Sequence, residues 1–290
     1  MTHPDLLRAK IAKANLLHVM AAHSPLSARL AEEAGFDGLW ASGFELSALY
    51  GLADVSLLSM TQHLDMVRAM AGQTNLPIIA DIDTGYGNAV NVDHVVREYE
   101  RAGASAVVIE DKAFPKVTSL LDGGRQILVR VEEFQGKIEA ALCARASRDL
   151  LVVARTEALI AGLGQDEALR RARAYEEAGA ELILVHSKSK SPEEIVSFMR
   201  AWDGSAKIVL VPTAYPQLTG AQIEALGKVA IVIYGNHAIR ASVTAMQAIF
   251  RLIREDGGIQ RAHDTMVSVE EIFRLQDMDR VKRLEAKFLR

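Results

Sequence analysis

The sequence predicts an α/β protein that folds as a TIM-type (β/α)₈ barrel. Eight short apolar segments alternate with segments of helical periodicity, and over 290 residues this pattern favours a closed barrel over an open doubly wound sheet. A weak repeat supports the same fold, because four helical segments end in a glycine shortly before an apolar run. Glycine readily adopts the left-handed conformation that ends a helix. These glycines are Gly35, Gly103, Gly179 and Gly227.

The predicted strands are apolar runs, nearly all of which end in a polar residue. They are expected near Leu17–Ala21, Gly38–Ser42, Pro77–Asp83, Ala106–Glu110, Leu150–Arg155, Glu181–His186, Lys207–Val211 and Ala230–Tyr234. Helical periodicity between them is clearest over Asn91–Ala102, Gln165–Ala178 and Pro192–Trp202. Ser191 is expected to cap the last of these helices, with Pro192 at its first position.

More helix follows the eighth strand than a barrel needs. Asn236–Glu255 and Ser268–Leu289 are each predicted to form an amphipathic helix. We therefore expect one barrel domain over residues 1–290, in which residues 236–290 form a C-terminal helical extension. Surplus amphipathic helix usually packs on a neighbouring subunit or over the barrel rim, so a homo-oligomer is expected.

The composition argues against several classes of protein. A net charge of −4 and 24% charged residues give no support to a nucleic-acid partner. No apolar run approaches the roughly 20 residues that span a bilayer, and the N-terminus lacks a signal-peptide pattern, so neither export nor membrane association is expected. The single cysteine, Cys143, cannot form an internal disulfide, which favours the cytoplasm. Nucleotide-binding glycine motifs are absent from the sequence.

Three acidic residues stand at the ends of two successive predicted strands. Asp81 and Asp83 are two residues apart and would share a strand face, and Glu110 would lie about 5 Å away on the next strand. Such close carboxylates resist ionisation together unless a cation binds among them. Oxygen ligands without His or Cys predict Mg²⁺, with Mn²⁺ as a substitute. The alternative is that these acids only cap the following helices.

The second predicted strand ends in a segment that could bind a carboxylate or an enolate. Ser42 offers a hydroxyl, and Gly43 and Phe44 offer backbone N–H groups. The alternative is a plain turn between a strand and a helix. Trp40 precedes this segment and is grouped with it as a substrate contact. Asp54 follows in a polar loop, where it is either a solvated acid or part of the site.

Two cationic or titratable residues end later strands. Arg155 follows a buried apolar run, where a guanidinium needs an anion. That anion is either a phosphoryl or carboxylate group of the substrate, or a structural partner such as Glu157 or Glu110. His186 is either a ligand contact with a proton role or a satisfied core residue.

The segment from Asp111 to about Val129 is long for a connection between a strand and a helix. It contains a proline and two adjacent glycines, as an active-site lid would, and the alternative is a disordered surface insertion. Lys116, Thr118 and Ser119 could present several hydrogen-bond donors to an anion as such a lid closes.

These motifs together resemble the isocitrate lyase/phosphoenolpyruvate mutase superfamily, and the resemblance covers the whole chain. It is carried by the segments Asp81–Gly87, Ile109–Lys116, Val153–Ala158 and Glu271–Gln276. Carbon–carbon lyases of this superfamily have a cysteine two positions after the lid lysine, where this chain has Thr118, so cleavage of isocitrate or methylisocitrate is not expected. In the branch that acts on phosphonopyruvate, mutases have asparagine at this position, and Thr118 resembles the hydrolytic members.

The resemblance implies a metal site and an assembly. Asp81 would bind Mg²⁺ directly, and Asp54, Asp83 and Glu110 would bind it through water, with Mn²⁺ or Co²⁺ as substitutes. The fold implied is a (β/α)₈ barrel whose last helix is exchanged between subunits, commonly in a tetramer built as a dimer of dimers.

The resemblance also implies roles at the substrate. Ser42, Gly43 and Phe44 would receive the carboxylate end, near Trp40 and Asp81, and the phosphonate would be surrounded by the remaining candidates. The residues implied in catalysis are Asp54, Lys116, Thr118, Arg155 and His186, and Ser119 is implied in phosphonate binding. Asp54 would act as a base or as a transient phosphoryl acceptor.

The expected activity is Mg²⁺-dependent hydrolysis of the P–C bond of 3-phosphonopyruvate to pyruvate and phosphate. The first alternative is the mutase reaction, which interconverts phosphonopyruvate and phosphoenolpyruvate. A second is hydrolysis or cleavage of a 2-oxo-dicarboxylate such as oxaloacetate. The last is a non-catalytic barrel that a metal stabilises for assembly.

Overall fold

The structure is a computed structural model that describes residues 4–121 and 123–290. The chain divides into two compact units, the first ending at Ala238 and the second covering Ile239–Arg290. The expectation of one barrel domain with a helical extension over residues 236–290 stays a prediction. Within the described ranges, no helix is long and apolar enough to cross a membrane.

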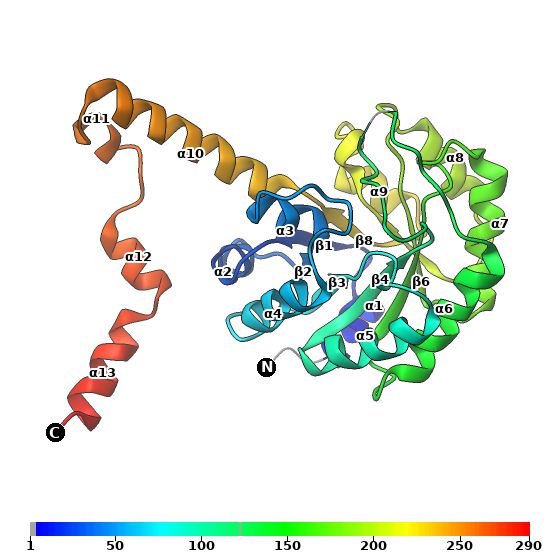
Figure 1. Ribbon diagram of the computed structural model, residues 1–290, viewed down its shortest axis with the longest axis horizontal. Coiled ribbons are helices and arrows are strands. Elements are labelled where there is room, and N and C mark those ends of the chain that lie inside the picture. The colour runs from blue at the N-terminus through cyan, green and yellow to red at the C-terminus, as the bar shows by residue number, and fades with distance from the viewer. Residues whose placement is uncertain (1–3, 122) are drawn as a thin grey trace. The chain divides into compact units, whose positions relative to one another are not determined.

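The first unit is a closed barrel of eight parallel strands, as predicted. The strands pair in sequence order, and the barrel closes where β8 pairs with β1. Figure 1 shows helices surrounding this barrel. The strands are β1 (Leu17–Ala22), β2 (Gly38–Ala41), β3 (Ile78–Asp81), β4 (Ala104–Glu110), β5 (Leu151–Thr156), β6 (Leu182–Val185), β7 (Lys207–Leu210) and β8 (Val229–Tyr234).

Helix α1 precedes β1, and the other helices of the first unit lie between successive strands. They are α1 (Pro4–Lys13), α2 (Pro25–Glu33), α3 (Gly43–Leu49), α4 (Met60–Ala71), α5 (Ala89–Arg101), α6 (Val131–Ala144), α7 (Gly164–Glu177), α8 (Glu193–Ala201) and α9 (Gly220–Ala225), with a 3₁₀ turn, η1 (Pro212–Ala214). The four predicted helix-ending glycines are confirmed, because each has a φ between +72° and +100°. A side chain would be strained in that conformation.

One predicted cap lies one residue away from the expected position. Helix α8 begins at Glu193, and Pro192 instead of Ser191 occupies the capping position. The Ser191 hydroxyl still accepts a hydrogen bond from the backbone N–H of Glu193 at 3.4 Å. The serine therefore satisfies a free N–H of the helix start, although the helix begins one residue later than predicted.

Two apolar layers hold the barrel together. Inward-facing residues of alternating strand positions, such as Val19 and Val153, fill its interior. Leu7 of α1 belongs to the same cluster and is fully buried. Outward-facing residues pack against the helices in a second, larger cluster. Both faces of each strand are thus covered, which explains the continuous apolar runs in the sequence.

The second unit is helical. Its elements are α10 (His237–Asp256), which begins just before the division, then α11 (Gln260–His263), α12 (Val269–Leu275) and α13 (Met278–Phe288). The predicted helix over Asn236–Glu255 is confirmed. The single helix predicted over Ser268–Leu289 is wrong, because Asp277 has a φ of +54° and separates α12 from α13.

Candidate active site

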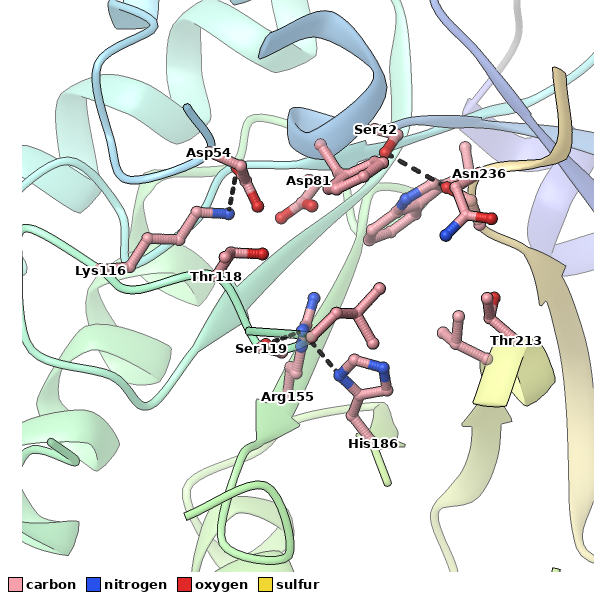
Figure 2. A pocket seen from close by; sticks show the side chains of 15 residues that line it. Ser42, Asp54, Asp81, Lys116, Thr118, Ser119, Arg155, His186, Thr213 and Asn236 are labelled. Atoms are coloured by element: carbon pink, nitrogen blue, oxygen red, sulfur yellow. Dashed lines mark hydrogen bonds and ion pairs between the residues drawn. The ribbon is translucent and has the colours of Figure 1, made fainter. Parts of the chain in front are cut away.

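A pocket opens at the rim where the carboxyl ends of the strands meet (Figure 2). Of the thirteen site residues predicted from the sequence, ten line it: Trp40, Ser42, Phe44, Asp54, Asp81, Lys116, Thr118, Ser119, Arg155 and His186. The other three, Gly43, Asp83 and Glu110, lie directly against residues that do. The residues chosen by the strand-end rule thus lie together at one rim of the barrel.

Five further residues line the pocket and were not among the predicted site residues: Leu120, Val211, Thr213, Gly235 and Asn236. Four of them follow β7 and β8 directly. The strand-end rule that identified Arg155 and His186 also points to Thr213 and Asn236 at the ends of the last two predicted strands, although neither was assigned a role from the sequence. Leu120 comes from the middle of the lid, where an apolar residue gives no sequence signal.

The acidic residues converge, although one step of the sequence argument is wrong. Strand β3 ends at Asp81, and Asp83 lies beyond it with a φ of +51°, so the two do not share a strand face. A tight turn brings them together instead, since the backbone N–H of Asp83 donates to Asp81 Oδ1 at 3.2 Å. The backbone N–H of Glu110 donates to the carbonyl oxygen of Asp83 at 2.8 Å, which brings β4 to the same place.

Lys116 of the lid is the cation nearest to these acids. Its Nζ lies 2.7 Å from Asp83 Oδ1 and 3.0 Å from Asp54 Oδ1. Burial alone would lower the pKa of Lys116, but Asp83 and Asp54 raise it well above the usual value. Lys116 is therefore an ammonium ion in this arrangement and cannot act as a base.

The carboxylates nevertheless carry more negative charge than Lys116 balances. Burial raises the pKa of Asp83 to about 7 despite the opposing effect of Lys116, and burial also raises the pKa of Asp81. Glu110 Oε1 is buried and accepts no hydrogen bond within the described residues. Such a group calls for a further cation or donor.

The acids fit a hydrated divalent ion better than a closed metal cage. Among the residues that the structure describes, no three His, Cys, Asp or Glu side chains form a group that could ligate one ion directly. A single direct carboxylate ligand, with other acids reached through water, is the usual way in which Mg²⁺ is bound. The unpartnered oxygen of Glu110 and the oxygen-only donor set agree with such a site.

Arg155 has structural partners and also lines the pocket. Its Nε lies 2.6 Å from Glu157 Oε1 and 3.3 Å from Glu110 Oε2, so the ion pairs considered as the alternative do form. Burial would lower the pKa of Arg155, but Glu157 and Glu110 raise it above the usual value. The guanidinium is thus permanently charged and is held at the pocket wall by two carboxylates.

His186 is held as a neutral imidazole beside Arg155. Burial lowers its pKa, although Glu157 opposes the effect. His186 Nδ1 lies 3.0 Å from Arg155 Nη2 and 3.1 Å from Glu157 Oε1. Nδ1 can accept from Arg155, which only donates and would put the ring proton on Nε2, or it can donate to Glu157, whose carboxylate only accepts. Figure 2 shows the far side of this ring facing the pocket, where an Nε2–H could donate to an anion.

The segment from Asp111 to Val129 folds over the pocket from an ordered base. Ala113 N–H donates to the carbonyl of Ile127 at 2.8 Å, and Val129 N–H donates to the carbonyl of Asp111 at 2.9 Å. Lys116, Thr118 and Ser119 lie between these paired ends and reach the pocket. Over its described residues, the segment has the arrangement expected of a lid and not that of a disordered insertion.

A buried ionic network ties the lid to the barrel. Lys112 Nζ lies 3.0 Å from Glu157 Oε2 and donates to Ser119 Oγ at 2.6 Å and to the carbonyl of Val117 at 2.8 Å. Ser119 Oγ in turn donates to Glu157 Oε2 at 2.5 Å and accepts from Arg155 Nη2 at 3.0 Å. The only hydroxyl proton of Ser119 is therefore used by Glu157.

The segment after β2 forms the start of a short helix. Ser42 Oγ accepts from the backbone N–H of Glu45 at 3.2 Å and caps α3. Gly43 approaches the acids so closely that a Cβ would lie 3.1 Å from Asp83 Oδ1. Glu45 is fully buried, with His23 Nδ1 2.8 Å from its carboxylate. The turn and the helix cap expected as the alternative are present, and they place backbone N–H groups at the pocket.

Comparison with known proteins assigns the family. The model of the family described as phosphoenolpyruvate phosphomutase matches residues 7–254. A phosphonopyruvate hydrolase of Variovorax sp. (strain Pal2) is 60% identical over 290 residues, which cover all of both chains.

This chain belongs to the phosphoenolpyruvate phosphomutase family. A phosphoenolpyruvate phosphomutase of Tetrahymena pyriformis is 43% identical over 283 residues, which cover 98% of this chain and 94% of that protein. A crystal structure of phosphonopyruvate hydrolase in complex with oxalate and Mg²⁺ superposes with a TM-score of 0.95 at 58% identity and covers 100% of both chains. The superfamily resemblance predicted from the sequence is confirmed.

The buried ionic network around Glu157 predicts that replacing this residue strongly lowers the stability of the protein. Glu157→Gln keeps the shape of the side chain but leaves Lys112 and Arg155 buried with one carboxylate fewer. We expect the free energy of unfolding in urea to fall by about 3–5 kcal/mol. Glu181→Gln serves as the control, because Glu181 pairs with Arg145 but is 24% exposed, and a loss of about 1 kcal/mol is expected. Equal small losses for both variants would contradict the network.

Proposed function

We propose that this chain catalyses the Mg²⁺-dependent hydrolysis of 3-phosphonopyruvate to pyruvate and phosphate. The observation that carries the proposal is full-length identity of 60% to a phosphonopyruvate hydrolase, together with a threonine, Thr118, at the lid position. The structural relative with bound oxalate and Mg²⁺ supports the metal and the substrate class. Oxalate resembles the enolate of pyruvate in its planar shape and its negative charge.

The acids at the ends of β3 and β4 would hold the ion. Asp81 is the proposed direct ligand, and Asp54, Asp83 and Glu110 are reached through water. When bound, Mg²⁺ supplies positive charge that stabilises the enolate oxygen formed as the P–C bond breaks. Mn²⁺ or Co²⁺ is proposed to substitute for it, because both accept oxygen ligands.

The two ends of the substrate would meet different parts of the pocket. The backbone N–H groups at the start of α3, around Ser42, Gly43 and Phe44, receive the carboxylate, and Trp40 packs beside it. Arg155 and His186 hold the phosphonate, one as a permanent cation and the other as a neutral donor. This division places the P–C bond between β3 and β5.

The reaction transfers the phosphoryl group to water. The electron pair of the P–C bond goes to the carbon and forms pyruvate enolate, while a water oxygen bonds to phosphorus in a loose transition state. Arg155 balances the charge on the phosphoryl oxygens. The water gives one proton to Asp54 as its oxygen bonds to phosphorus, and transfer of that proton from Asp54 to the enolate carbon completes pyruvate. Lys116 closes over the acids as a cation, and Ser119 holds the lid against Glu157.

Thr118 is proposed to decide between hydrolysis and the mutase reaction. Figure 2 shows its side chain at the pocket on the side of Asp54 and Asp81. Threonine is shorter than asparagine, so it leaves room for a water that its hydroxyl can orient. A mutase must exclude this water and return the phosphoryl group to the enolate oxygen.

The direct test is incubation with phosphonopyruvate and Mg²⁺, followed by phosphorus NMR. We expect the phosphonate signal to be replaced by that of inorganic phosphate. EDTA should abolish the reaction and excess Mg²⁺ should restore it, and Asp81→Asn should lower kcat/KM by about 100-fold or more. Phosphoenolpyruvate as the only product would assign the mutase reaction instead, and no conversion of phosphonopyruvate would favour a 2-oxo-dicarboxylate substrate.

Replacement of the lid threonine tests the proposed partition. Thr118→Asn should lower the rate of phosphate release by about tenfold or more, because asparagine fills the space of the water. Vinyl proton signals of phosphoenolpyruvate should appear in the NMR spectrum of the products. Thr118→Ser, which keeps the hydroxyl, is the control and should keep releasing phosphate. An unchanged rate and product for Thr118→Asn would remove Thr118 from the mechanism.

We also propose a homo-oligomer, a tetramer built as a dimer of dimers, in which α10 is exchanged between subunits. On α10, Val243, Met246 and Phe250 share one face and are 41%, 44% and 65% exposed. The outer side of β1 and β8 carries a hollow lined by Met20 and Tyr234, among others. An apolar helix face and an uncovered strand pair are complementary surfaces.

A cytoplasmic location is proposed from the lone cysteine.

Light scattering after gel filtration tests the assembly. The unaltered chain should have about four times its own mass of 31.6 kDa. Phe250→Glu puts a charge on the apolar face of α10 and should lower the mass of the particle. Thr244→Glu changes the charge on another side of the same helix and should not. A monomeric mass for the unaltered chain would exclude the exchange.

A further inference from the structure

One buried hydroxyl in the pocket wall has no partner. Thr213 Oγ1 is shielded from solvent and makes no hydrogen bond within the described residues. Burial of an unpaired hydroxyl is unfavourable compared with its hydration in water. Six other residues in the described ranges also have a buried side-chain polar atom without a hydrogen-bond partner. Of these seven residues, Thr213 is the one that lines the pocket. A bound molecule in the pocket could therefore supply the missing partner.

The position of Thr213 follows from the barrel. It lies in η1, directly after β7, and β7 pairs with β6 and β8. His186 follows β6 and Asn236 follows β8, so Thr213 stands between them along the rim. Figure 2 shows Thr213 on the same side of the pocket as Asn236, away from Lys116 and Asp54.

The neighbouring glycine keeps space in front of this wall. A Cβ at Gly235 would lie 3.1 Å from Val211 Cγ1 and 3.7 Å from Thr213 Oγ1. A side chain at this position would therefore crowd Val211 and narrow the approach to the hydroxyl. Gly235 thus leaves the wall around Thr213 free of a further side chain.

The chemistry of the hydroxyl fixes what it can bind. An oxyanion only accepts hydrogen bonds, and threonine has one proton to donate. A phosphonate has three terminal oxygens, whereas a carboxylate has two in one plane. Arg155 lies at the end of β5, His186 follows β6 and Thr213 follows β7, so three adjacent strands carry three donors at their carboxyl ends. The proposed carboxylate contacts lie at β2, on another part of the rim.

We infer that Thr213 is a specificity-determining residue whose hydroxyl donates a hydrogen bond to an oxygen of the substrate's phosphonate group. The inference rests on the proposed function and adds a third donor to the contacts of Arg155 and His186. Thr213 thereby favours a tetrahedral phosphonate over a planar carboxylate at this end of the pocket.

The test compares two probes on one set of variants. Binding of phosphonoacetate, which has a phosphonate and a carboxylate, and of oxalate, which has carboxylates only, is measured by calorimetry with Mg²⁺ present. Thr213→Val removes the hydroxyl and keeps the shape of the side chain, so it should weaken the binding of phosphonoacetate by about 10- to 100-fold. Oxalate should change by less than about twofold. Thr213→Ser should restore phosphonoacetate binding.

Tyr215→Phe is the matched control, because Tyr215 also has a buried hydroxyl without a partner in the described chain and does not line the pocket. Its binding of both probes should be unchanged. Equal weakening of both probes by Thr213→Val would place the hydroxyl at the carboxylate end and overturn the inference. Equal affinity of the unaltered chain and of Thr213→Val for phosphonoacetate would also overturn the inference.

Failure of the proposed function gives a different result. If the unaltered chain binds phosphonoacetate but releases no phosphate from phosphonopyruvate, the proposed hydrolysis is wrong, and the ratio of the two probes still decides the role of Thr213. If the unaltered chain binds oxalate but not phosphonoacetate, the phosphonate contact is excluded.

Discussion

The site depends on keeping several buried like charges close together. Asp81, Asp83 and Glu110 meet at one rim, and burial raises the pKa of Asp81 and of Asp83. Lys116 balances only part of this charge, and Glu110 Oε1 has no partner in the described residues. A hydrated divalent cation is the simplest way to complete the balance, and the same cation can then stabilise an enolate. One bound cation would therefore both stabilise the acidic rim and support the reaction.

Two ionic clusters lie on either side of the pocket, and the lid contributes to both. Lys116 pairs with Asp54 and Asp83 on one side, whereas Ser119 joins Glu157 and Arg155 on the other. The lid segment therefore takes part in both clusters. Thr118 lies between these two anchors, and its carbonyl oxygen accepts a hydrogen bond from Gln126 Nε2 at 3.1 Å. A short side chain at this position can change access of water without disturbing either cluster.

Much of the fold and part of the site could be predicted from local patterns. The alternation of apolar runs, with glycines at Gly35 and Gly179 where φ is positive, follows from backbone geometry and burial alone. Strand ends located Arg155 and His186 because a parallel barrel gathers those ends at one rim. The position of Asp83 could not be predicted, because a turn with positive φ replaces the strand that the spacing suggested.

The sequence by itself determined the eight-stranded barrel, the acids at two strand ends and the family resemblance, because each is written in local spacing. Only the tertiary structure decided the partners of those residues. It paired Lys112 and Arg155 with Glu157, used the Ser119 proton within the lid, and left Thr213 without a partner in the described chain. These outcomes depend on distances between segments far apart in the chain, and a list of residues contains no such distances.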